Sequence, residues 1–305
     1  MYTISFDRLT KRYGSVLAVD GLSFDVEPGR VTGFLGPNGS GKTTTLRMLL
    51  GLAAPDGGTA TINGVRYRDL PDPARTVGAA LEADSFHPGR SAIEHLRIMA
   101  TAAGIPRHRA AQVLDLVGLA EAARRRAGGF SLGMRQRLTL ATTLLGDPGV
   151  LILDEPLNGL DPDGIRWMRA LLRQLAVEGR TVLVSSHLLA EAAQTVDDVV
   201  VIARGRLAAQ GPVAKLAAAT STTRIRTPDT ELLMAVLARQ QITARLVAPG
   251  TVEVRGADPD RVARIAAAAS VIVLELSRHT DNLEDLFFDL TSDRAGNRAL
   301  EVCPS

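Results

Sequence analysis

The stretch Gly36-Pro37-Asn38-Gly39-Ser40-Gly41-Lys42-Thr43-Thr44 follows a short apolar run at residues 31–35 and opens a helical pattern at residues 43–50. Glycines let consecutive backbone N–H groups turn toward phosphates at a helix N-terminus, where the helix dipole also favours negative charge. In this pattern the lysine reaches the β- and γ-phosphates and the hydroxyl of Thr43 is a ligand for Mg²⁺. The order strand, loop, helix predicts a P-loop that binds ATP and Mg²⁺ rather than a plain glycine-rich turn.

A pair of carboxylates follows the apolar run at residues 150–153: Asp154 and Glu155. Doubly wound sheets bind ligands at the carboxyl ends of their strands, so both side chains are expected near the phosphates. We expect Asp154 to hold the Mg²⁺ shell and Glu155 to orient and deprotonate the attacking water. The alternative is that the pair only caps a turn before Pro156.

With the carboxylates behind a P-loop, residues 1–215 resemble the ABC ATPase family. The stretch FSLGMRQR at residues 130–137 resembles the signature of that family, LSGGQ, at Ser131 and Gly133, and departs from it at Leu132 and Met134. Physically, a hydroxyl and an N–H group at a helix start form a second anion-binding end, although a plain helix cap gives the same pattern.

Other positions carry the resemblance further. Asp161 matches the D-loop, which lies across the dimer interface, and His187 matches the switch histidine that contacts the γ-phosphate. Tyr13 is where the family places an aromatic ring that stacks on adenine. The resemblance therefore assigns Tyr13, Ser131, Gly133 and Asp161 to nucleotide binding, and His187 to catalysis beside Glu155 and Lys42.

The Q-loop position departs from the family. Glu82 replaces the usual glutamine after the strand-like residues 77–80. A carboxylate still binds Mg²⁺ or a water molecule, so we group Glu82 with Thr43 and Asp154 as metal ligands. By resemblance, residues 82–94 form the surface that touches a membrane subunit.

The element pattern predicts an α/β protein of the ABC type. A β-rich first lobe precedes a helical insert at residues 93–126, and apolar strands at 150–153 and 181–185 flank a helix at 164–177, which indicates a buried parallel sheet. Residues 224–277 alternate as strand, helix, strand, strand, helix and strand, a ferredoxin-like order whose last strand is expected at 271–276. We expect domains at residues 1–215 and 216–292 and a disordered tail at 293–305.

Charge, cysteine count and apolar run length limit the classes of partner that we expect. The formal net charge is +2 and the only cysteine is Cys303, so neither nucleic-acid binding nor an intrachain disulfide is expected. The longest apolar run, residues 265–274, is half the length of about 20 residues that a bilayer span needs. A membrane role would require a partner, with this chain peripheral at the cytoplasmic face.

One P-loop and one signature stretch occur, and in the family each ATP lies between the P-loop of one subunit and the signature of another. The resemblance therefore implies a dimer, expected to be a homodimer, that powers a separate polytopic permease. The sequence around Asp161 and the C-terminal extension resemble the corresponding segments of ATPases of multidrug and antibiotic-resistance exporters. The substrate is therefore expected to be a drug or another hydrophobic compound. The alternatives are a soluble ABC ATPase without a permease and a P-loop kinase or GTPase.

Overall fold

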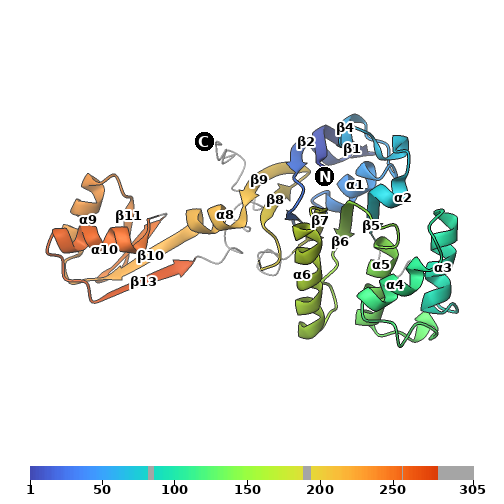
Figure 1. The fold of residues 1–305 in the computed structure, drawn as a ribbon. Helices are drawn as coiled ribbons and strands as arrows, with labels where there is room; N and C mark the ends of the chain where they lie inside the picture. The colour runs from blue at the N-terminus through green and yellow to red at the C-terminus, as the bar shows by residue number, and fades with distance from the viewer. Residues whose placement is uncertain (82–85, 188–193, 256, 281–305) are drawn as a thin grey trace. The chain divides into compact units, whose positions relative to one another are not determined.

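The computed structural model describes residues 1–81, 86–187, 194–255 and 257–280. The chain divides into two compact units, one formed by residues 1–210 and the other beginning at Gly211 (Figure 1). Some expectations lie wholly or partly outside the described residues: the metal ligand Glu82, the start of the membrane-subunit surface at 82–94, the end of the domain at 216–292, the C-terminal extension at 282–290 and the disordered tail at 293–305.

A six-stranded sheet forms the centre of the first unit. Its strand order is β5-β6-β7-β3-β8-β9, and the pairs from β5 to β8 are parallel. The strands are β3 (Val31–Leu35), β5 (Val77–Ala80), β6 (Val150–Asp154), β7 (Thr181–Ser186), β8 (Asp198–Ala203) and β9 (Arg206–Pro212). The apolar residues of β3, β6 and β7 are buried throughout, as expected for strands covered on both faces.

An antiparallel sheet of order β2-β1-β4 packs on this centre, with β1 (Ile4–Tyr13), β2 (Val16–Val26) and β4 (Gly57–Ile62). The two sheets share one core. The ring of Phe24 on β2 stacks on Phe6 of β1 with centroids 4.3 Å apart and lies 5.3 Å from the ring of Phe34 on β3. Removing one such ring from a closed core costs about 3 to 5 kcal/mol, so this cluster fixes the β-rich lobe against the P-loop strand.

Helices complete the first unit: α1 (Lys42–Leu49), α2 (Pro73–Thr76), α3 (Ala92–Ala102), α4 (Arg109–Leu116), α5 (Leu132–Thr143) and α6 (Pro162–Val177), with 3₁₀ turns η1 (Tyr67–Asp69) and η2 (Ala127–Gly129). Helices α3, α4 and α5 pack on one another (Figure 1). Side-chain caps fix where two of them begin: Ser91 and Glu94 form a reciprocal capping box at α3, and Ser131 caps α5.

The second unit has the order expected for a ferredoxin-like domain. After α8 (Val213–Thr220), the elements are β10 (Ser221–Arg226), α9 (Thr230–Arg239), β11 (Ala244–Ala248), β12 (Thr251–Arg255), α10 (Pro259–Ala268) and β13 (Glu275–Thr280). The sheet is antiparallel with the order β11-β12-β10-β13, and both helices pack on its core.

The expected position of the last strand was wrong. The strand is β13 at Glu275–Thr280, and the apolar residues Ile272, Val273 and Leu274 before it are exposed. In the register, Glu275 pairs with Arg226, the last residue of β10. Pro228 follows closely and has no N–H group to continue the ladder, so the pairing cannot extend back to residue 271.

No helix within the described residues is long and apolar enough to cross a membrane.

Candidate functional site

The P-loop joins β3 to α1, as the sequence predicts. Gly41 caps α1 with φ +105°, and a Cβ there would lie 2.5 Å from the carbonyl oxygen of Ala18. A Cβ on Gly36 would lie 2.5 Å from the carbonyl oxygen of Ile202. Both positions therefore exclude every side chain, so only glycine fits the loop there. Thr44 lies half-buried in the first turn of α1.

Lys42 lies folded back against the loop. Its Nζ donates to the carbonyl oxygens of Gly36 at 2.6 Å and Pro37 at 3.3 Å, and it is 4.0 Å from Oε1 of Glu155. Desolvation lowers the pKa of Lys42, against the opposing effect of Glu155 and Asp154. Because its partners are loop carbonyls that phosphate oxygens can replace, this ammonium is available to a nucleotide.

Asp154 ends β6 beside the P-loop. Its Oδ2 accepts a hydrogen bond of 2.8 Å from the hydroxyl of Thr43, and its Oδ1 accepts one from Ser185 on β7. The parallel register between β6 and β7 pairs Asp154 directly with Ser185. The carboxylate and the threonine hydroxyl thus meet at the carboxyl edge of the sheet, where the sequence predicts metal ligands.

Glu155 has a left-handed backbone with φ +51°. Its N–H group donates to the hydroxyl of Ser185 at 3.0 Å and its carbonyl oxygen accepts from the N–H group of Asn158 at 3.2 Å. The carboxylate lies 2.9 Å from Nδ1 of His187. A non-glycine residue in this conformation costs about 1 to 3 kcal/mol, and such strain concentrates at functional sites.

The other motif residues lie together elsewhere. Ser131, Gly133 and Asp161 line one cavity of about 510 Å³, and no P-loop residue lines it. Ser131 accepts from the N–H group of Met134 at 3.3 Å, and Asp161 caps α6 through the N–H group of Gly164 at 2.7 Å. The plain helix cap that the signature stretch also allowed is therefore real, Asp161 caps a helix as well, and both caps coexist with an open cavity.

Leu132, which differs from the signature of the family, packs against Gly159. Gly159 has φ +73°, and a Cβ there would lie 2.1 Å from Cδ2 of the Leu132 side chain. The amide of Gln136, one turn further along α5, donates to the carbonyl oxygen of Asn158 at 3.4 Å. These two contacts hold the start of α5 against the loop that connects Glu155 to Asp161.

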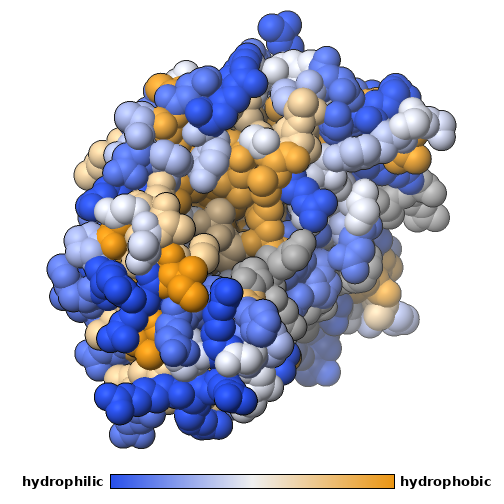
Figure 2. Space-filling model, turned by 90° about the vertical axis from the view of Figure 1, so that its right-hand side faces the viewer, coloured by the Kyte–Doolittle hydropathy of each residue, from blue (hydrophilic) through white to orange (hydrophobic). Residues whose placement is uncertain are grey.

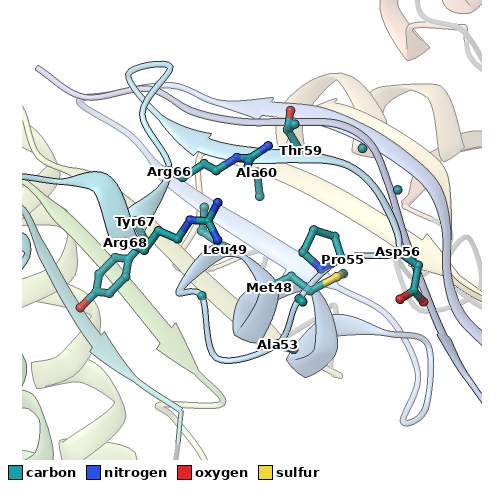
Figure 3. Close-up of a pocket in the computed structure, with 14 residues that line it drawn as sticks. Met48, Leu49, Ala53, Pro55, Asp56, Thr59, Ala60, Arg66, Tyr67 and Arg68 are labelled. Carbon is teal, nitrogen blue, oxygen red and sulfur yellow. The ribbon is translucent and has the colours of Figure 1, made fainter.

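Tyr13 ends β1 with half of its surface exposed, and its ring lies near the ammonium of Lys11. The carboxylate of Asp56 binds Lys11 and also lines a second cavity, of about 420 Å³, between the end of α1, β4 and η1 (Figure 3). None of the predicted site residues lines that cavity.

Two contributors were not predicted. Ser185 holds both Asp154 and the backbone of Glu155, and Lys11 lies beside Tyr13. The position of Ser185 at the end of a buried strand, next to the strand of Asp154, is the signal that could have indicated it. Lys11 is one of three lysines among 35 Lys and Arg residues, which is a weaker signal.

Residues 19–158, which span the P-loop, the signature stretch and the acidic pair, match the sequence profile of a family described as ABC transporter. The chain is 46% identical over 207 residues to the bacitracin transport ATP-binding protein BcrA of Bacillus licheniformis, which covers 67% of this chain and 68% of that protein. The chain belongs to the ABC transporter ATP-binding family. It is accordingly an ATPase of the P-loop class, and the expected fold class is confirmed.

Further relatives agree. Over 296 residues, 95% of this chain and 96% of the relative, the ABC protein is 32% identical to the bacitracin transport ATP-binding protein BcrA of Enterococcus faecalis. The Nod factor export ATP-binding protein I of Burkholderia orbicola is 42% identical over 216 residues, 68% of this chain and 70% of that protein. Residues 221–284 match a domain of unknown function.

Solved structures show the same fold. One titled as the ATP binding subunit of an ABC transporter is 28% identical, with a TM-score of 0.63 over 70% of this chain and 91% of that chain. The dimeric structure of MJ0796, a bacterial ABC transporter cassette, is 23% identical, with a TM-score of 0.63 over 69% of this chain and 98% of that chain.

Proposed function

We propose that this ABC ATPase powers export through a separate polytopic permease, and that two copies close head to tail around two ATP molecules at the cytoplasmic face of the membrane. The observation that carries the proposal is the convergence of Lys42, Thr43, Asp154, Glu155 and His187 at one edge of the parallel sheet. The relatives named for bacitracin transport and Nod factor export support an exporter of drugs or other hydrophobic compounds.

The residues divide the chemistry among them. Glu155, held by Ser185 and Asn158, orients the attacking water and takes its proton, while His187 positions the Glu155 carboxylate and meets the γ-phosphate. Lys42 exchanges its loop carbonyls for phosphate oxygens. The hydroxyl of Ser40 is buried without a partner among the described residues, which fits a phosphate oxygen as its acceptor.

Thr43 and Asp154 would hold Mg²⁺, because a hydroxyl and a carboxylate that meet at 2.8 Å are the oxygen donors that this ion prefers. When bound, Mg²⁺ would neutralise charge on the phosphate oxygens. Glu82 remains a proposed further ligand. Ser131, Gly133 and Asp161 would take the nucleotide held by the P-loop of the second copy, and their open cavity supports that role.

The side of the molecule that carries α3 supports a docking site for the permease. Figure 2 shows this side, with hydrophobic atoms gathered in a hollow. Leu52, which follows α1, is 68% exposed, and Ile98 and Met99 of α3 are exposed as well. Exposed apolar patches are typical of protein interfaces, so the hydrophobic hollow supports this docking site. We assign nucleotide binding and docking to residues 1–215 and a separate role to the small domain at residues 216–292.

The decisive experiment uses tagged Glu155→Gln protein, loaded with ATP to hold the dimer closed and recovered from detergent-solubilised membranes for mass spectrometry. The expected result is a co-purifying polytopic membrane protein. Leu52→Glu in the same background should lose that partner, and Leu232→Glu, at an exposed leucine of the second unit, should keep it. Recovery alone, or only with soluble proteins, would contradict the transporter function and favour an ABC ATPase without a permease.

A further inference from the structure

Lys11 and Tyr13 lie two residues apart on β1 and therefore on the same face of the strand. The Nζ atom of Lys11 is 5.4 Å from the centroid of the Tyr13 ring, within the range of a cation–π interaction. The Lys11 side chain is only 15% exposed, whereas Tyr13 is 51% exposed. The ammonium is thus enclosed beside a ring that remains open to a ligand.

Asp56 fixes the ammonium in this place. One of its carboxylate oxygens is 3.0 Å from Nζ of Lys11, and the other accepts a hydrogen bond of 2.6 Å from the N–H group of Arg12. Its own N–H group donates to the carbonyl oxygen of Thr10 at 2.9 Å. The backbone hydrogen bond from Arg12, followed by the bond from Lys11, lowers the pKa of Asp56, so the carboxylate is ionised at neutral pH. Figure 3 shows Asp56 at one end of the cavity beyond α1.

The choice of lysine at position 11 is unusual for this chain. Only three of its 35 Lys and Arg residues are lysines, and one of those is Lys42 of the P-loop. An ammonium on a slender stem is compact, whereas a guanidinium is a planar fork. The enclosed space between the Tyr13 ring and Asp56 suits the compact group.

We propose that Lys11, held by Asp56, is a specificity-determining positioning residue that fixes the Tyr13 ring as a platform for the purine base of the nucleotide. This inference rests on the proposed function and on the family resemblance, which implies that Tyr13 stacks on adenine. A ring ordered before the base arrives leaves less conformational entropy to lose on binding, so the contact favours nucleotides that carry a base over phosphate alone.

The test compares the affinities of the full-length variants Lys11→Met, Tyr13→Ala and the double variant for MgATP and for magnesium tripolyphosphate, by calorimetry. Lys11→Met should weaken MgATP binding by about three- to tenfold, the scale of a partly desolvated cation–π contact, and leave tripolyphosphate binding unchanged. The double variant should bind MgATP no more weakly than Tyr13→Ala, because the two residues act through one contact.

Two further variants separate charge and folding from position. Lys215→Met removes the same charge from the second unit and should bind MgATP like the unaltered protein. Asp56→Asn keeps an oxygen that accepts from Arg12 but releases Lys11, so it should weaken MgATP binding by about two- to fivefold. This milder variant decides the matter should Lys11→Met fold poorly.

Equal losses of MgATP and tripolyphosphate affinity in Lys11→Met would overturn the inference, because Lys11 would then act as a charge on the phosphates. Unchanged MgATP affinity in Lys11→Met or in Asp56→Asn, or fully additive losses in the double variant, would overturn it too. If Tyr13→Ala itself bound MgATP normally, the proposed adenine platform would fail and Lys11 with it. A loss in Tyr13→Ala without one in Lys11→Met would refute Lys11 alone.

Discussion

Two buried serines near the nucleotide site should respond in opposite ways to replacement by alanine. Ser185 has no exposed surface and makes two hydrogen bonds, to the N–H group of Glu155 and to the carboxylate of Asp154. Ser40 is 3% exposed, and its hydroxyl has no partner among the described residues. Removing the two hydroxyl groups therefore perturbs the nucleotide-free protein unequally.

The magnitudes follow from these contacts. Ser185→Ala loses a bond to a charged acceptor, worth about 1.5 to 3 kcal/mol, and strands a buried N–H group, so the free energy of unfolding should fall by about 3 kcal/mol. Ser40→Ala removes a hydroxyl that is buried at a cost, so the nucleotide-free protein should keep its stability or gain up to about 1 kcal/mol. The same variant should bind MgATP more weakly.

The assay is urea unfolding without nucleotide, followed by the fluorescence of Trp167, the only tryptophan. Trp167 lies on α6 of the first unit, with the guanidinium carbon of Arg137 4.1 Å from its ring centroid, so the signal reports this unit. A second series with MgATP measures how much ligand stabilisation each variant retains. An equal fall in the free energy of unfolding of Ser40→Ala and Ser185→Ala, or no change in either, would contradict the unequal roles of the two hydroxyl groups.

Three further outcomes are expected. Gly41→Ala should lower the free energy of unfolding by more than about 3 kcal/mol and abolish MgATP binding, because its Cβ would meet the carbonyl oxygen of Ala18. Gly39 has φ +78° with open space around it, so Gly39→Ala should lower the free energy of unfolding by only about 1 to 2 kcal/mol. Similar urea midpoints for the two variants would contradict this difference. Glu155→Gln should bind ATP normally but lose about 10² to 10⁴ in turnover, measured as phosphate release, and near-normal turnover would remove Glu155 from the role of base. Burial, and to a lesser extent the charge of Arg90, lowers the pKa of His95 below its ordinary 6.5. As the pH falls, the unfolded chain therefore binds a proton at this histidine before the folded chain does. The His95 contribution to the free energy of unfolding should be complete above about pH 6.5 and should fall below that pH. The urea midpoints at about pH 7.5 and 5.5 should differ less in His95→Gln than in the unaltered protein. The same difference in both proteins would exclude His95 as a source of the stability lost at low pH.

The part of the site that the sequence predicts is the part written in contiguous motifs. The P-loop forms from consecutive residues, and the rule that ligands bind where parallel strands end brings Asp154 to Thr43 without any knowledge of the register. Ser185 was missed because only the pairing of β6 with β7 places its hydroxyl under Asp154. The Lys11–Asp56 contact was missed because only the pairing of β1 with β4 brings Asp56 beside Lys11, and neither residue belongs to a motif.

The order of helices and strands was predicted in the same way, from local patterns. Buried apolar strands and helix caps reveal the elements of both units, since local pattern and tertiary burial agree there. The last strand was misplaced because residues 271–274 are more apolar than β13 itself, and apolar character alone does not reveal where a pairing partner ends.

The contact between Leu132 and Gly159 also constrains how this chain can evolve. With Leu at 132, any Cβ at 159 would fall inside the leucine side chain, and φ +73° already disfavours other residues there. The atom in the way is the end of a flexible, half-exposed side chain that can turn aside, so the backbone conformation of Gly159 is the stronger constraint. Glycine should therefore persist at position 159 in related chains even where the residue at position 132 is small.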